Sequence, residues 1–227
     1  CSITSSTISS SSFSCSDIGY NSVGLNLSDA SGNVDSCTAT VNISDTTAPT
    51  AVCNDLTVYL NSFGFTTITS ADVDGGSSDN CGITSSILSD TVFTCAHLGS
   101  NTVTLTLSDA SGNTDTCNST VTVIDSVSPI MICRSASLIL DATGSATLSA
   151  SAVDSASTDN CSITSLVVSD STIGCADIGT TTVLLTGTDA SGNSASCSAT
   201  VTSSDTTAPM AVCQNISVFL DGSGCAS

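Results

Sequence analysis

The sequence repeats itself every 80 residues, and this period constrains the fold more than any other feature. The segment LSDASGN at 27–33 recurs at 107–113 and, as GTDASGN, at 187–193. Twelve of the 13 cysteines follow the same period, which predicts small tandem domains rather than one core for the whole chain. The periodic cysteines are Cys1, Cys15, Cys37, Cys53, Cys81, Cys95, Cys117, Cys133, Cys161, Cys175, Cys197 and Cys213.

Within one repeat the pattern predicts β-strands only. The segment TVTLTLSD at 102–109 alternates apolar and polar residues, and CNSTVTVID at 117–125 does the same. The intervening DASGN predicts a hairpin turn, because Gly112 and Asn113 are both able to take positive φ. About seven short strands per repeat, with β-branched rather than aromatic core residues, predict an all-β fold of tandem immunoglobulin-like sandwiches held by disulfides.

The three prolines, Pro49, Pro129 and Pro209, mark the junctions, and we place domain boundaries near residues 45, 125 and 205. Residues 46–125 and 126–205 are then complete repeats. Residues 1–45 are the second half of a repeat and residues 206–227 the first strands of another, and we expect neither part to fold alone. Together they are about 13 residues short of a repeat, the missing stretch corresponding to ITSADVDGGSSDN.

The two partial repeats complement each other, which leaves two interpretations open. In the first, the strand MAVCQNISVFL at 210–220 of one chain completes the N-terminal half-repeat of the next chain and builds a homopolymer by strand addition. In the second, these residues are a window on one continuous repeat chain, and the window starts and ends within a repeat. Both give a fibre.

The order of motifs resembles the hyalin-type (HYR-like) tandem repeats of secreted proteins, especially bacterial cell-surface versions. The motifs are SxDNC, FxC, LG, VTLTxSDASGN, a cysteine, a β-rich strand, then DTTAP and a cysteine, and they extend over essentially the whole chain. The resemblance implies an immunoglobulin-like fold and an extracellular structural or adhesive role. It implies no reaction.

The cysteines predict disulfides rather than zinc, because zinc sites favour closely spaced CxxC pairs and histidines, and the chain has one histidine. Disulfides indicate an oxidising compartment, so we expect a secreted or cell-surface protein. Four cysteines per repeat allow three connectivities. We favour closing the short loops, each worth about 3 kcal/mol in the chain-entropy model. The resulting pairs are Cys1–Cys15, Cys81–Cys95, Cys161–Cys175, Cys53–Cys117 and Cys133–Cys197, with Cys37 and Cys213 left at opposite ends and Cys225 lacking a counterpart.

Aspartate is the only acidic residue, and its repeated positions predict calcium sites at the junctions. Loops at one end of a sandwich should bring Asp74, Asp79 and Asp109 near the linker residue Asp45, and carboxylates suit calcium, which takes 6 to 8 oxygen ligands. The alternative is that these residues only stabilise turns through Asx hydrogen bonds. The corresponding residues are Asp125, Asp154, Asp159 and Asp189 at the next junction, with Asp29 and Asp205 across chains.

Glycosylation is a further expectation. Sequons occur at Asn26, Asn42, Asn118 and Asn215, with a weaker one at Asn160, and serine and threonine tracts offer sites for O-glycans.

Charge and motifs exclude other classes. With a formal net charge of -19 and one basic residue, the chain has nothing to neutralise phosphates, so we expect no nucleic-acid binding, and no apolar run predicts membrane insertion. His97 replaces an aspartate of the other repeats and predicts a surface loop residue, while Arg134 predicts a cap on a local carboxylate. We expect no enzyme and no organic cofactor. The sequence favours the shaft of an extracellular filament; the alternatives are an adhesin stalk or carbohydrate- or cell-binding module, and an accessory module of a secreted hydrolase.

Overall fold

The computed structural model describes residues 2–220 and 222–225, and its regular secondary structure consists mainly of β-strands. The chain divides into two compact units, Cys1–Val127 and Ser128–Ser227. The all-β prediction is confirmed.

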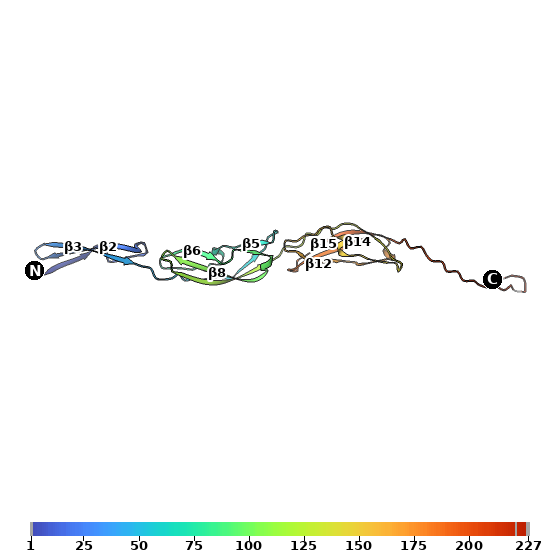
Figure 1. Ribbon diagram of the computed structural model, residues 1–227, viewed down its shortest axis with the longest axis horizontal. Coiled ribbons are helices and arrows are strands. Elements are labelled where there is room, and N and C mark those ends of the chain that lie inside the picture. The colour runs from blue at the N-terminus through green and yellow to red at the C-terminus, as the bar shows by residue number, and fades with distance from the viewer. Residues whose placement is uncertain (1, 221, 226–227) are drawn as a thin grey trace. The chain divides into compact units, whose positions relative to one another are not determined.

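The described residues of the first unit, from residue 2 on, form three sheets. Strands β1, β2 and β3 form one sheet, with β2 and β3 side by side (Figure 1), β4-β9-β8-β6 a second and β5-β7 a third. The elements are β1 (Ile3–Ile8), the 3-10 turn η1 (Cys15–Asp17), β2 (Gly19–Asp29), β3 (Val34–Ile43), β4 (Leu56–Tyr59), β5 (Phe65–Thr67), the single-turn helix α1 (Ser70–Val73), β6 (Ile83–Leu88), β7 (Val92–Thr94), η2 (Cys95–His97), β8 (Gly99–Asp109) and β9 (Thr114–Ile124).

The second unit repeats the four-stranded and two-stranded sheets, as β10-β15-β14-β12 and β11-β13. The elements are β10 (Ala136–Ile139), β11 (Ser145–Thr147), α2 (Ala150–Val153), β12 (Ile163–Val168), β13 (Thr172–Gly174), η3 (Cys175–Asp177), β14 (Gly179–Asp189) and β15 (Ser194–Ser204). Residues 206–220 lie beyond β15 and form no strand.

Alternation along the strands places the core. In β8, Val103, Leu105 and Leu107 are at most 2% exposed, and Val121 of β9 is completely buried. Phe93 is 2% exposed and lies on β7, which belongs to the two-stranded β5-β7 sheet of the same repeat. Six named strands, rather than the seven expected, form the repeat, because two of its other pairings are isolated bridges, including Cys53 with Asp74.

The DASGN hairpin forms where the sequence predicts it. Strands β8 and β9 pair antiparallel from Gly99 to Ser108, and Gly112 takes φ +88° in the turn. Asn113 does not use positive φ in this turn; its backbone carbonyl accepts from Asp109 N–H, and its own N–H donates to the Asp109 carboxylate.

The N-terminal half-repeat forms the sheet β1-β2-β3 within the first compact unit, where the Cys15–Cys81 disulfide bonds it to the next repeat, so the expectation that it does not fold alone stays a prediction. The sheet nevertheless lacks the cover that the complete repeats have. Leu25 and Val41 are only half-buried, whereas their counterparts Leu105 and Val121 are completely buried. Phe13 is 37% exposed although its counterpart Phe93 is 2% exposed. Strands β3, β9 and β15 end at Ile43, Ile124 and Ser204, just before the proposed domain boundaries. The boundaries themselves stay predictions.

Candidate metal site at the repeat boundary

The disulfides follow two rules, of which the sequence predicted one. Cys53 joins Cys117 with Cα atoms 5.7 Å apart, and Cys133 joins Cys197 at 5.8 Å, as expected. These bonds tie the first segment of a repeat to its β9 or β15 strand. The other prediction was wrong: Cys81 does not bond Cys95.

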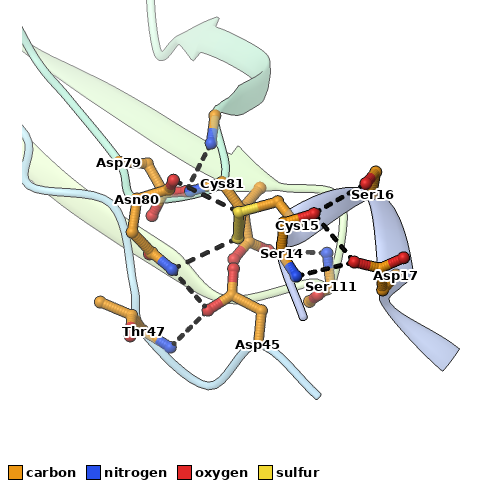
Figure 2. Close-up of a disulfide and its surroundings, with 12 residues drawn as sticks. Ser14, Cys15, Ser16, Asp17, Asp45, Thr47, Asp79, Asn80, Cys81 and Ser111 are labelled. Carbon is orange, nitrogen blue, oxygen red and sulfur yellow. Dashed lines mark hydrogen bonds between the residues drawn. A yellow bond between two sulfur atoms is a disulfide. The ribbon is translucent and has the colours of Figure 1, made fainter. Parts of the chain in front are cut away.

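Cys81 instead bonds Cys15, 66 residues earlier, across the boundary between the half-repeat and the next repeat. Figure 2 shows this disulfide beside Asp45, with the turn η1 on one side. Because Cys15 is bonded to Cys81, the predicted Cys1–Cys15 pair is also wrong, and Cys1 itself lies outside the described residues. The predicted Cys161–Cys175 pair is wrong as well, since Cys175 carries no disulfide.

The strand paths explain this correction. The six residues of β6 extend about 20 Å, and they carry the chain away from Cys81. Strand β7 then pairs with β5 of the other sheet instead of returning along β6, so that the sulfur of Cys95 ends 3.6 Å from the Gly64 carbonyl oxygen. Cys95 and Cys161 are both disulfide-bonded, and Cys37, Cys175 and Cys213 are exposed without a disulfide.

Three carboxylates meet beside the Cys15–Cys81 disulfide. Oxygen atoms of Asp45, Asp79 and Asp109 lie within 4.8 Å of one another. Asp45 follows β3, Asp79 precedes β6 and Asp109 ends β8, so the cluster draws one residue from the linker and two from loops of the following repeat. This is the convergence that the repeated aspartates predict.

Local hydrogen bonds fix each carboxylate. The Asp79 Oδ2 atom accepts the N–H groups of Cys81 and Gly82, both at 2.8 Å. The Asp45 Oδ1 atom accepts Thr47 N–H at 3.1 Å and the Asn80 side-chain amide at 3.2 Å (Figure 2). These bonds leave the second oxygen of each group pointing elsewhere.

Those second oxygens are the informative atoms. Asp45 Oδ2 and Asp79 Oδ1 are buried from solvent and accept no hydrogen bond. A buried carboxylate oxygen without a partner is costly, and three clustered negative charges repel one another. A divalent cation would relieve both costs at once.

Asp109 begins the DASGN turn, and the residues of that turn stabilise its ionised form. Burial alone would raise its pKa, but the Asn113 side-chain amide at 2.7 Å and the N–H groups of Asn113, Ser111 and Gly112 hold the pKa below its ordinary value. Asn113 also donates to the Asp45 backbone carbonyl at 3.2 Å and so links the turn to the linker. The expected Asx turn therefore forms, and each carboxylate oxygen still has a lone pair to offer.

Asp74 was expected in this cluster and lies outside it. It is exposed, and its Oδ1 atom accepts Ser77 N–H at 2.9 Å and Gly76 N–H at 3.2 Å. The bridge between Asp74 and Cys53 keeps Asp74 beside the first segment of the repeat, which explains the difference.

The second unit repeats the local bonding. Asp159 accepts the N–H groups of Cys161 and Ser162, as Asp79 does, and Asp189 accepts Ser191 and Asn193 as Asp109 does. Asp154 binds Ser157 and thereby matches Asp74. For the remaining predicted ligands, Asp125, Asp29 and Asp205, the structure gives the same turn contacts, to Val127, Asn33 and Thr207 respectively.

The other singled-out residues have structural roles. The His97 ring nitrogen Nδ1 accepts Thr94 N–H at 3.0 Å, the position that the Asp17 carboxylate takes in η1, and the ring packs edge-on against Phe93 at 5.8 Å. Arg134 donates to the carbonyls of Ser151 and Ala152 at the end of α2. The Ser157 side chain holds the pKa of Asp154 below its ordinary value, and the Arg134 charge adds to this effect, as expected for a cation beside a local carboxylate. The sequon residues Asn26, Asn42, Asn118 and Asn215 are all exposed, and Asn160 is half-buried.

Among the described residues, no helix has both the length and the apolar character needed to cross a bilayer.

Two facing sheets in each complete repeat, with a disulfide fixing the first segment to the last strand, define an immunoglobulin-like β-sandwich module. Residues 44–123 match the family model of the HYR domain, so the resemblance seen in the sequence is confirmed for this repeat. A search of curated proteins finds no match.

Solved structures of low similarity include extracellular repeat proteins. Cadherin domains 1-4 of protocadherin gamma B7 are 12% identical, with 84% of this chain and 59% of that chain covered and a TM-score of 0.35. An I-band fragment of titin is 13% identical, with 82% and 75% covered and a TM-score of 0.42. The chain thus spans about three fifths of the first of these structures.

Proposed function

We propose that the chain is a structural segment of an extracellular filament, in which consecutive immunoglobulin-like repeats form the shaft. The observation that carries this proposal is the Cys15–Cys81 disulfide, because it bonds one repeat covalently to the next instead of closing a loop within a repeat. The absence of a reaction and the extracellular location both remain part of the proposal.

The proposal includes calcium at the boundary. Asp45, Asp79 and Asp109 would each supply carboxylate oxygens, and the two buried oxygens without hydrogen bonds would be its first ligands. Three carboxylates supply at most six oxygens, and calcium accepts 6 to 8, so water or backbone carbonyls would complete the shell. The ion would offset the local negative charge and fix the linker against the loops of the following repeat.

Electron microscopy of native material tests the filament. Regular fibres with a periodic 80-residue repeat are the expected result. Dispersed short rods with one decorated end would contradict it and favour an adhesin stalk.

A matched pair of variants tests the calcium site. Asp79→Asn keeps an oxygen that can accept from Cys81 and Gly82 but replaces the unbonded oxygen by an amide. Asp74→Asn is the control, because Asp74 lies outside the cluster. We expect calcium at about 10⁻⁴ to 10⁻³ M, the range of extracellular modules, to slow hydrogen exchange at residues 44–47 and 79–82 in the wild type and in Asp74→Asn but not in Asp79→Asn.

The exchange readout is local, so ions bound elsewhere do not confuse it. Magnesium at the same concentration is the ion control, because it demands a stricter octahedral shell. If neither calcium nor EDTA changes hydrogen exchange at residues 44–47 and 79–82 of the wild type, the calcium site is refuted. The filament proposal would not be affected by that result.

A further inference from the structure

Strand β3 is the edge of its sheet. Among the described residues it pairs with β2 alone, whereas the corresponding strands β9 and β15 each carry a parallel strand on the other side, β4 and β10. An unpaired edge presents backbone N–H and C=O groups in register for another strand. The N-terminal sheet therefore has room for one parallel strand beside β3.

The same sheet is short of cover for its apolar side chains. Val23, Leu25 and Leu27 of β2 are half-buried, while the corresponding residues of β8 are at most 2% exposed. In the complete repeats the corresponding position beside β9 or β15 is taken by the first segment of the repeat, and among the described residues no such segment pairs with β3.

A segment with the required pattern lies at the other end of the chain. The 80-residue period places residues 216–219 at the positions of β4 and β10, yet residues 206–220 form no strand. Their apolar side chains are strongly exposed, at Met210 (88%), Val212 (84%), Ile216 (80%), Val218 (59%), Phe219 (88%) and Leu220 (69%). By contrast, Leu60, the counterpart of Leu220, is 3% exposed.

We propose that residues 210–220 of a second copy of this chain add to β3 as a parallel strand. The pairing of Leu56 with Val121 and of Tyr59 with Ile124 sets the register. Shifted by the repeat, it places Ile216 of the added copy beside Val41 and Phe219 beside Ser44. The same shift places Cys213 beside Cys37, as Cys53 lies beside Cys117, and both residues carry exposed thiols in the single chain.

Side-chain sizes match this pairing. In the second unit, Met131 fills the space beside Gly187, where a Cβ atom would come within 3.0 Å of the Met131 methyl carbon. The first unit has the opposite combination at these positions, Ala51 with Leu107. The proposed joint has Ala211 with Leu27, which is the same small-and-large combination as Ala51 with Leu107.

A disulfide then closes the joint. The thiols of Cys37 and Cys213 lose two protons and two electrons as the S–S bond forms, and a small-molecule disulfide such as oxidised glutathione takes them up and is reduced to two thiols. A second link follows from the period, because Cys175 of the added copy corresponds to Cys15, and Cys1 of the copy that carries β3 corresponds to Cys81. Cys175 is exposed and unbonded, and Cys1 lies outside the described residues.

This inference rests on the proposed function and gives it a mechanism of assembly. The completed joint would still lack counterparts of residues 68–80, which include the buried side chains of Ile68 and Val73. We therefore expect the joint to be the least stable repeat of the filament, which makes its disulfides the decisive contacts.

Isotope mixing tests the proposal on the full chain. Equal amounts of ¹⁴N-labelled and ¹⁵N-labelled protein are oxidised together with oxidised glutathione, and disulfide-linked peptides are mapped by mass spectrometry. We expect Cys37 to be linked to Cys213, with about half of the linked peptides carrying one label from each copy. Peptides of a single isotope, or Cys213 linked to Cys225, would overturn the proposal.

Size variants test the strand itself. Ala211→Met places a large side chain against Leu27, and overpacking of this kind should lower the yield of mixed-label peptide about tenfold. Adding Leu27→Gly should restore it, because it reproduces the Met131–Gly187 combination. Cys225→Ser is the control and should have no effect. Unchanged hydrogen exchange in β8 and β14 shows that the variants fold, and an Ala211→Met yield equal to wild type would refute the register.

Failure of the inference is distinguishable from failure of the proposed function. Fibres without the Cys37–Cys213 link would support the filament and refute this joint. Mixed-label links in particles that never form fibres would support the joint and refute the filament.

Discussion

Removal of the Cys53–Cys117 disulfide gives the sharpest test of how a repeat is held together. The double variant Cys53→Ala/Cys117→Ala opens a loop with a sequence separation of 64 residues. The chain-entropy model gives about 4 kcal/mol at 25 °C for a loop of this length. The Cys15–Cys81 disulfide overlaps part of this loop and already restricts the unfolded chain, so the expected loss lies between about 2 and 4 kcal/mol.

Hydrogen exchange measured by mass spectrometry is the assay, because two units in one chain need not unfold in a single step. Every 1.4 kcal/mol changes an opening equilibrium about tenfold, so protection of amides in β8 and β9 should fall roughly 30-fold to 1000-fold. Protection in β14 and β15 should remain unchanged.

The second unit supplies the matched control. Cys133→Ala/Cys197→Ala removes the corresponding bond, and it should reverse the pattern by weakening β14 and β15 only. A loss of less than about fivefold in β8 and β9 would refute the loop-entropy reasoning, since it falls below the smallest stabilisation expected for such a bond. Loss of protection in both units from either variant would refute the independence of the two cores.

Three further outcomes are expected. Asn113→Ala removes the amide that binds the Asp109 carboxylate at 2.7 Å and the Asp45 carbonyl, and it should cost about 1 to 3 kcal/mol, measured as faster exchange in the 109–113 turn; unchanged exchange would contradict it. Acid should open the same turn: the folded pKa of Asp109 lies below the ordinary 3.8, so its stabilisation is present above that value and is lost as pH falls through the folded pKa, and a turn equally protected at all acid pH values would disagree. His97→Asp should keep the 3-10 turn as stable as wild type, because a carboxylate can accept Thr94 N–H as the other repeats do, whereas His97→Ala should weaken it by about 1 kcal/mol.

The fold was accessible from the sequence because strand alternation and burial report the same physics. The residues of β8 that alternate in the sequence are those whose side chains fill the core, so the hairpin and its Asx turn followed directly. The convergence of Asp45, Asp79 and Asp109 also followed, from their positions at strand ends.

The disulfide partners of Cys81 and Cys15 were not accessible by the same route. Loop length describes the entropy of the unfolded chain, whereas a disulfide forms only where the folded strands bring two cysteines close together. Strand β6 leads the chain away from Cys81, and β7 pairs with β5, so Cys95 lies elsewhere. One signal could have identified Cys81: it follows Asp79 by two residues, and Asp79 was already expected at the boundary. A cysteine so close to a boundary residue faces the preceding repeat.

The Cys15–Cys81 disulfide also determines what happens when the chain is pulled along its length. Tension that enters at Cys15 passes through one sulfur–sulfur bond to Cys81, so the residues between them carry none of it. A fully extended chain spans at most 3.3 to 3.6 Å per residue, so the disulfide prevents the chain between its cysteines, a separation of 66 residues, from adding about 220 Å to the length of the pulled chain. Unfolding of the sheet between these cysteines would then lengthen the molecule very little. Such a strand would resist extension covalently and become compliant only in a reducing medium.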